Sequence, residues 1–347
     1  MAENRDRPTF SSDYGRMVAV TNPNSSRYHL LLGALERLKK ETAGRNRDFI
    51  EIQTVSGDHP QNTAHIRSQL WPGDRVVSMG GDGLGRDAFN AIAGNPDLNQ
   101  WPLLEVALGF YPGGGFNDNS VIYGHDRGLT HFLTSRSVTL TDLTPLQITN
   151  NGNHLWYSPL YASFGPTAET ADVLNSGKVR ETIRHTPAML KKAYGAFVLA
   201  RSFMENGLNY RLPPFTHNGA VHTDIGSIMV HNAPVMAAVL RSNEAWHRDP
   251  ERFLTSFIPA STRDYADYFA RGLINTFGGA RTQVLLPGTP VTELNLDFHD
   301  QEAWLQSEGE ATRQRLGQVA ISKPLAATVP IVDVRRHIAS EEDKSFY

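Results

Sequence analysis

The chain has 347 residues, of which 40% are hydrophobic and 20% charged, as in an ordinary globular protein. That length exceeds what one compact core usually holds, so two domains are expected. A net charge of -3 argues against a general nucleic-acid binder that neutralises phosphates. The absence of cysteine excludes disulfides, thiolate metal sites and cysteine nucleophiles.

The amino-terminal stretch, MAENRDRPTFSSDYGR, is polar and lacks the apolar core of a signal peptide. No stretch of the sequence approaches the roughly 20 apolar residues that a membrane-spanning helix needs. We therefore expect a cytoplasmic protein. If it acts on a lipid, it must do so as a peripheral protein at the inner face of the membrane.

Strands and helices alternate over the first part of the chain. Apolar runs predict strands at 17–22, 48–56, 74–81 and 103–115, and helical periodicity predicts helices at 25–43, 61–71 and 84–94. Alternation with short connections is typical of a parallel sheet with helices on its faces. The sequence thus predicts a Rossmann-like α/β domain over residues 14–137, and the loops described below assign this domain to nucleotide binding.

After residue 137 the pattern becomes richer in strands. Residues 137–165 read as a β-meander with a hairpin at Asn151-Gly152, a helical stretch covers 186–207, and further strands are expected at 220–232 and 281–298. We predict a β-rich, sandwich-like α+β domain over 138–325, with the active site in the cleft between the domains. The last β-like run, 327–338, is expected to return to the first domain within a segment from about 326 to 347.

A glycine turn interrupts VVSMGGDGLGRDAFNAI, which runs from Val76 to Ile92. Gly80, Gly81 and Gly83 surround Asp82 between a predicted strand and a predicted helix. Backbone N–H groups at such a helix start can bind phosphate. A carboxylate there suggests Mg²⁺ between it and the phosphate. The alternative is a tight turn capped by the Asp side chain, and the segment alone does not decide between them.

Two further loops follow neighbouring strands. Phe110–Ser120 holds a second glycine loop with Asn117 and Asp118, and Asn22–Ser26 ends the first strand. The carboxyl ends of parallel strands meet at one edge of the sheet, where doubly wound folds bind ligands. The three loops together favour a nucleotide site, although Asn117-Asp118 could equally form a simple Asx-bonded turn.

These loops resemble the diacylglycerol kinase catalytic-domain family, which includes bacterial lipid kinases and sphingosine kinases and is related to NAD kinases. Its Asn-Pro-x-Ser-Gly loop is similar to Asn22-Pro23-Asn24-Ser25-Ser26. Its Gly-Gly-Asp-Gly-Thr signature is similar to Gly80–Leu84, with Asn90 in the helix that follows. Its Pro-x-Gly-Thr-x-Asn-Asp loop is similar to the segment from Pro112 to Asp118.

The second half resembles the family more loosely. Phe164-Gly165 and Ala168 resemble its Gly-x-x-Ala, and Ala193-Tyr194 lies where the family has a similar pair. Glu308-Gly309-Glu310 resembles its Asp-Gly-Glu. The resemblance extends from residue 17 to about 335.

The resemblance implies an ATP- and Mg²⁺-dependent kinase that phosphorylates a hydroxyl of diacylglycerol, a sphingoid base or a related lipid. Glu310 would be the general base, and Asp82 would act with it in catalysis. Asp82 and Asp118 would be the candidate metal ligands. The nucleotide would be contacted by residues of the three loops and by a threonine that ends the second strand: Asn22, Pro23, Asn24, Ser25, Thr54, Gly80, Gly81, Gly83, Gly114 and Asn117.

Three positions depart from the family pattern. Leu84 and Gly115 replace two threonines, and Glu308 replaces an aspartate. One hydroxyl-to-phosphate hydrogen bond contributes about 0.5–3 kcal/mol, so we expect the two losses to weaken ATP binding or slow transfer without abolishing either. Two alternatives therefore stay open: an NAD kinase-like enzyme, and a catalytically weak protein that binds nucleotide or lipid.

Other residues carry less weight. The basic residues near the predicted helix 186–207 could contact anionic lipid headgroups, but such charges are more often a solvated face. The 13 histidines include no His-Glu-x-x-His metal pair, and Ser158 and Ser163 lack the surroundings of a hydrolase nucleophile. Members of the family often form dimers, so a homodimer is an open alternative; no nucleic-acid partner is expected.

Overall fold

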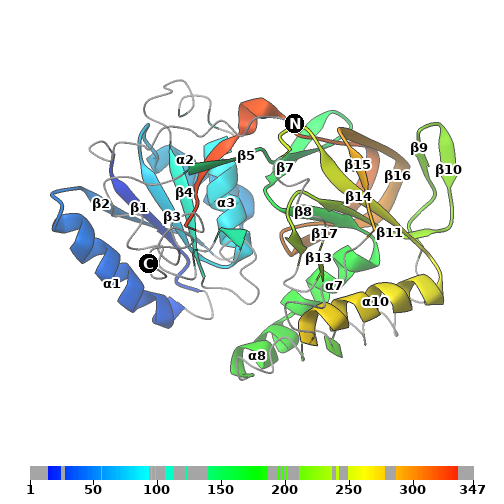
Figure 1. Ribbon diagram of the computed structural model, residues 1–347, viewed down its shortest axis with the longest axis horizontal. Coiled ribbons are helices and arrows are strands. Elements are labelled where there is room, and N and C mark those ends of the chain that lie inside the picture. Colours follow the sequence, from blue (N-terminus) through cyan, green and yellow to red (C-terminus); the bar gives the residue numbers. More distant parts are fainter. Residues whose placement is uncertain are drawn as a thin grey trace, which may run out of the picture. The chain divides into compact units, whose positions relative to one another are not determined.

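The computed structural model of the chain describes residues 15–24, 28–55, 57–93, 95, 98, 106–112, 122, 123, 125, 140–186, 194, 197, 198, 201, 211–236, 240, 241, 249–277 and 287–334. The chain divides into two compact units, with boundaries between Thr144 and Pro145 and between Leu325 and Ala326. The first unit combines helices with a sheet of mostly parallel strands, and the second contains a large antiparallel sheet (Figure 1).

The first unit is built on a six-stranded sheet in the order β2-β1-β3-β4-β18-β5. The strands β1 to β4 and β18 pair with one another in parallel, and β5 runs antiparallel to β18. Their bounds are Met17–Thr21 (β1), Phe49–Gln53 (β2), Arg75–Gly80 (β3), Ala107–Pro112 (β4), Leu140–Leu143 (β5) and Val329–Val332 (β18). The chain therefore returns to the first sheet after the second unit.

In the described residues, three helices accompany this sheet: α1 (Tyr28–Ala43), α2 (His59–Gln69) and α3 (Asp82–Ala93). Side chains from one face of α1, including Leu31 and Leu35, share a buried cluster with Met17, Ala19 and Val77 of β1 and β3. Met17 and Ala19 are two residues apart along β1, so their side chains lie on the same face of the sheet. Helix α3 is buried from Leu84 to Ala93.

The second unit contains a ten-stranded antiparallel sheet, whose main path is β15-β14-β11-β8-β16-β17-β6-β7. The hairpin of β9 (Phe215–His217) and β10 (Ala220–His222) joins it through β16. The other bounds are Leu146–Asn150 (β6), Asn153–Ser158 (β7), Tyr161–Phe164 (β8), Ile225–His231 (β11), Phe253–Pro259 (β14), Thr289–Val291 (β15), Glu293–Ser307 (β16) and Glu310–Ser322 (β17). The pair β16–β17 is its longest hairpin.

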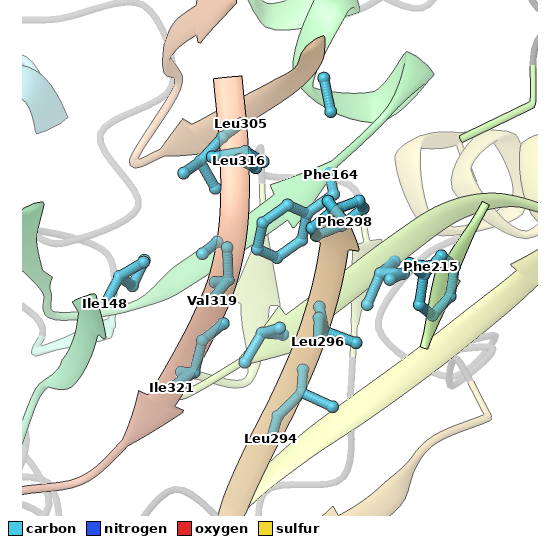
Figure 2. Close-up of a cluster of buried hydrophobic side chains, with 14 of the residues drawn as sticks. Ile148, Phe164, Phe215, Leu294, Leu296, Phe298, Leu305, Leu316, Val319 and Ile321 are labelled. Atoms are coloured by element: carbon cyan, nitrogen blue, oxygen red, sulfur yellow. The ribbon is translucent and has the colours of Figure 1, made fainter. Parts of the chain in front are cut away.

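The core of this unit gathers around β16 and β17 (Figure 2). Phe298 stacks against Phe164 at 5.6 Å between ring centroids and lies 5.4 Å from Phe215. The residues of β16 that face this core change from even numbers, such as Leu296, to odd numbers, such as Leu305. The pairing with β17 shifts between Asp297 and Gln301, so a bulge keeps apolar side chains on one face along the whole strand.

The second sheet is accompanied, in the part of the chain that the structure describes, by three helices: α7 (Pro166–Asn175), α8 (Gly177–His185) and α10 (Thr262–Phe277). A short 3₁₀ helix, η4 (Leu325–Ala327), precedes β18, and β12 (Val235–Met236) pairs with β13 (Leu240–Arg241). None of the helices in the described segments is both long enough and apolar enough to cross a membrane.

The predicted fold class is confirmed: an α/β sheet of mostly parallel strands and a β-rich second part are both present. The predicted hairpin at Asn151-Gly152 is confirmed as well, since β6 and β7 pair on either side of it. The predicted helix 186–207 lies largely outside the described residues. β14, α10 and β17 were not predicted, and β5, read from the sequence with the β-meander, pairs in the first sheet.

Gly165 precedes α7 with φ +83°, and a Cβ there would lie 2.4 Å from the carbonyl oxygen of Gly226. Gly152 has φ +76° but open space around it. We expect Gly152→Ala to lower the free energy of unfolding by about 1 kcal/mol from backbone strain alone. Gly165→Ala should cost about 3 kcal/mol or more, because a clash is added. Equal midpoints of denaturant unfolding for the two variants would contradict this.

Candidate functional site

The carboxyl ends of the parallel strands converge at one edge of the first sheet. Asn22 follows β1, Thr54 follows β2, and Gly81 follows β3. Because β1 pairs with β2 on one side and β3 on the other, the chain order reverses at β1. Ligands of open α/β sheets bind outside the strand ends at such a switch point. The structure therefore brings the start of the Asn22–Ser26 loop and the glycine turn after β3 to the same edge of the sheet.

The glycine turn joins β3 directly to α3. The amide of Gly85 donates to the carbonyl of Gly81 at 3.1 Å, so helical hydrogen bonding begins within the turn. The described glycines with positive φ do not include Gly80, Gly81 or Gly83, so the turn does not use glycine for a left-handed conformation. Asp82 stands in the first helical turn, where the helix dipole favours a negative charge.

Leu84 lies where the family has threonine. Its side chain is 8% exposed, and a Cβ at Gly80 would come within 2.6 Å of its Cδ2. The Leu84 side chain thus occupies the space that a side chain at position 80 would need, which explains glycine at that position. The substitution of threonine by leucine is thus accommodated by the core of the turn.

The ends of β1 and β2 are held together by Thr54. Its amide and its hydroxyl both donate to the carbonyl of Thr21, at 2.9 and 3.0 Å. With its hydroxyl proton used in this way, Thr54 would meet a ligand as a hydrogen-bond acceptor. In the loop after β1, the Asn22 side chain accepts a hydrogen bond from the amide of Asn24 at 2.9 Å, which is an Asx turn.

A buried polar network connects α3 to the end of β2. The Asn62 carboxamide accepts from the amide of Val55 at 2.9 Å and donates to its carbonyl at 2.8 Å. The same carboxamide donates to Asp87 at 3.3 Å, and Nδ1 of His59 lies 2.9 Å from that carboxylate. This network fixes the backbone next to Thr54 relative to the helix that carries Asp82.

Glu51 of β2 is a candidate that the sequence reading missed. Its Oε1 accepts from Thr21 Oγ1 at 2.9 Å and from Gln53 at 3.1 Å, and lies 3.4 Å from the Tyr28 hydroxyl. Burial raises the pKa of Tyr28, and the charge of Glu51 adds to this. Acidic residues that bind ribose hydroxyls follow the second strand of many dinucleotide-binding folds, so a carboxylate in the predicted second strand was the available signal.

The remaining loop residues fall outside the described part of the chain: Ser25, Gly114, Gly115, Asn117 and Asp118. Within the described residues, no group of three or more His, Asp or Glu side chains could hold a metal ion. Mg²⁺ in kinases is usually held by one or two carboxylates together with substrate phosphates. Asp82 at a helix start fits that smaller donor set, and a phosphate fits the backbone N–H groups beside it.

In the second unit, Glu310 is half-buried and begins β17, where it pairs with Ser307 of β16. The two residues between them have positive φ, +53° for Glu308 and +81° for Gly309, the pattern of a type I′ turn. A left-handed backbone at Glu308 costs about 1–2 kcal/mol. Gly309 accepts a hydrogen bond from the Asn175 side chain of α7 at 2.8 Å.

The side chain of Glu308, which the sequence reading treated only as a departure, is 3% exposed. Its Oε1 accepts from the amides of Leu160 and Tyr161 at 2.6 and 3.0 Å. The Ser158 hydroxyl lies 2.9 Å from the same oxygen and 2.5 Å from the carbonyl of Tyr161, and its single proton serves one of them at a time. These contacts give the buried Ser158 hydroxyl hydrogen-bond partners within the fold.

Helix α7 packs against β16 and β17, and its own start explains the Gly-x-x-Ala pattern. The carbonyl of Gly165 accepts from the amides of Ala168 and Glu169 at 2.9 and 3.0 Å, and Ala168 is fully buried. Burial raises the pKa of the Glu169 carboxyl, an effect that Arg313 of β17 opposes. Raised carboxyl pKa values are common at functional sites, so Glu169 of α7 is a second acidic candidate in this unit, besides Glu310.

Comparison with known proteins agrees with this geometry. Residues 16–143 match the sequence model of the diacylglycerol kinase catalytic domain. The similarity to this family therefore covers the first part of the chain. No curated protein sequence matches the chain significantly.

Solved structures share the fold over most of the chain. A crystal structure of a diacylglycerol kinase from Bacillus anthracis str. Sterne is 13% identical, with a TM-score of 0.56, and covers 93% of this chain and 98% of its own. Two structures from the same organism, provisionally named diacylglycerol kinases, are each 15% identical with TM-scores of 0.59. They cover 92% and 91% of this chain and 98% and 96% of their own. At these identities the likeness establishes the fold alone.

Within the segment that matches the diacylglycerol kinase catalytic domain, we expect Asn62→Ala to release the end of β2. It leaves two backbone groups of Val55 without their partner, so the free energy of unfolding should fall by about 1–2 kcal/mol. The amide of Val55 should exchange with solvent faster, measured by hydrogen–deuterium exchange. Gln61→Ala, an exposed neighbour on the same helix, is the control. Unchanged exchange at Val55 in Asn62→Ala would contradict the network.

Proposed function

We propose that this protein is a lipid kinase, which transfers the γ-phosphate of ATP to a hydroxyl of diacylglycerol, a sphingoid base or a related lipid. The observation that carries the proposal is the glycine turn at Gly80–Asp82. It opens α3 at the switch point of a parallel sheet, inside the segment that matches the diacylglycerol kinase catalytic domain. A helix start at a switch point is suited to phosphate binding.

The proposal assigns the nucleotide to the first unit. The backbone N–H groups at the start of α3 would hold phosphate oxygens, with Asn22 and Thr54 at the neighbouring strand ends. Asp82 would hold Mg²⁺ or contact the nucleotide directly. When bound, Mg²⁺ supplies positive charge that offsets the charge of the transferring phosphoryl group. Positioning and charge compensation account for most of the catalysis of such transfers.

The proposal assigns the acceptor chemistry to Glu310. Its carboxylate would take the proton of the lipid hydroxyl while the hydroxyl oxygen forms a bond to the γ-phosphorus. The bond from that phosphorus to the oxygen bridging to the β-phosphate breaks, and ADP leaves. A general base contributes about 10²–10⁴-fold to such a step. The anchored turn before Glu310 supports this assignment, because a base must be held in a defined position.

The first test uses purified full-length protein with γ-labelled ATP, Mg²⁺ and a mixed lipid extract. We expect label in a lipid with the wild type, and at least about 100-fold less with Glu310→Gln, since a general base is lost. Asp82→Asn should also fail to label lipid. The matched controls are Glu293→Gln, exposed on the same hairpin, and Asp48→Asn, exposed at the opposite end of β2.

The outcome of this experiment decides between functions. Label in a lipid with the controls but not with the two site variants supports the kinase and identifies the acceptor by its chromatographic mobility. No labelled lipid from wild-type protein that binds ATP would contradict the kinase. It would favour the second candidate, a nucleotide-binding protein with little catalysis, which the buried Leu84 at the threonine position supports.

Leu84→Thr tests that second candidate directly. The variant places the family's hydroxyl near the proposed phosphate site, so the affinity for Mg²⁺-ATP should rise by about 2–10-fold, from one added hydrogen bond. Losing the contact with Gly80 should lower the free energy of unfolding by about 2 kcal/mol. Leu84→Ala loses the packing without adding a hydroxyl. Equal affinities of the two variants by calorimetry would show that residue 84 does not face the nucleotide.

A further inference from the structure

The loop between β16 and β17 differs in sequence from two other loops of the second unit that have the same backbone. Each is a two-residue hairpin loop in which both residues have positive φ: Asn151-Gly152, Asn218-Gly219 and Glu308-Gly309. Asn-Gly is the favoured dipeptide for this turn, because asparagine and glycine tolerate the left-handed region. Glutamate has no such advantage, so its presence at 308 is not explained by the turn.

The hydrogen bonds of the Glu308 side chain explain why glutamate is present at this position. Oε1 of Glu308 lies within hydrogen-bond distance of two consecutive backbone amides, of Leu160 and Tyr161, and of the Ser158 hydroxyl. The amide of Glu308 also donates to the carbonyl of Tyr161, at 3.4 Å. The turn is therefore tied to the loop between β7 and β8 by its backbone and by its side chain.

These hydrogen bonds fix the position of Glu310. It follows Gly309 directly and is the first residue of β17, so its backbone moves with the turn. On the other side, the Asn175 side chain of α7 donates to the carbonyl of Gly309. A turn held from β8 and from α7 leaves little freedom for the start of β17.

We propose that Glu308 is the positioning residue of the active site: its buried carboxyl group anchors the turn so that Glu310 is presented to the lipid hydroxyl. This inference rests on the proposed function, in which Glu310 is the base. The proton transfer is not assigned to Glu308, because its side chain is buried and its Oε1 accepts from the amides of Leu160 and Tyr161. Its role is exerted through Glu310.

Two variants distinguish the effect of the Glu308 side-chain hydrogen bonds from the effect of the backbone turn. Glu308→Gly removes the side chain but suits the positive φ, and Glu308→Gln keeps the length and one acceptor oxygen. The control is Asn218→Gly, which makes the same Gly-Gly loop in the β9–β10 hairpin. The measurements are kcat and KM for ATP and lipid, and hydrogen–deuterium exchange at the amides of Leu160 and Tyr161.

We expect Glu308→Gly to lower kcat by about 10-fold or more, with KM for ATP within about 2-fold, because a displaced catalytic group slows chemistry. The two amides should exchange faster by about 10-fold once their acceptor is gone. Glu308→Gln should keep kcat within about 3-fold of the wild type and retain the protection. Asn218→Gly should leave kcat and the two amides unchanged.

Several results would overturn the proposal. Wild-type kcat in Glu308→Gly, or unchanged exchange at Leu160 and Tyr161, would show that the tie does not position Glu310. Glu308→Gln as inactive as Glu310→Gln would make Glu308 a proton carrier. An inactive wild type would refute the proposed function and this role with it, whereas an active wild type with a fully active Glu308→Gly refutes only the role of Glu308.

Discussion

The parallel pairing of β1 with both β2 and β3 is the constraint on which the first unit depends. It makes β1 the point where the chain order reverses, and it brings the ends of three strands to one edge. Everything assigned to the nucleotide depends on that edge. Thr54 is held to Thr21 there, and α3 starts there with Asp82 in its first turn. Backbone pairing thus determines where the site lies, and the loops determine what it can bind.

Rigidity at this edge comes from buried polar groups. Asn62 binds both backbone groups of Val55 and is itself oriented by Asp87 of α3. Burying a carboxamide costs little free energy when it hydrogen-bonds two backbone groups. If the carboxamide were turned away, each buried polar group left without a partner would add its desolvation free energy. The network therefore favours a single arrangement of the β2 end relative to α3. Close packing between Gly80 and Leu84 likewise favours a single arrangement of the glycine turn.

In the second unit too, contacts from neighbouring elements hold a candidate functional residue in place. There a long antiparallel hairpin carries the candidate base, and its turn is kept in a costly backbone conformation by contacts from β8 and α7. Strain held by surrounding contacts is a common property of functional sites. In both units the residues assigned to chemistry are few. The residues that hold them are more numerous, more buried and less apparent in the sequence.

Much of the fold follows from local patterns. Apolar runs and helical periodicity predicted β1 to β4 and α1 to α3, because one buried face imposes its period on each element. The glycine turn, with Asp82 between Gly81 and Gly83, was also evident, since strand, turn and helix are contiguous. β5 was read with the wrong neighbours, because a four-residue strand carries no signal of its partner. The roles of the site residues stay predictions.

The sequence by itself determined the local elements, the glycine turn and the family resemblance, since each depends on neighbouring residues. Only the tertiary structure decided that Asn62 supports Thr54, that Glu51 lies among three donors at the strand ends, and that Glu308 anchors the turn before Glu310. The last contact joins residues 148 positions apart. No local pattern encodes it, because it exists only after β8, β16 and β17 have paired and brought a buried carboxyl group to two backbone amides.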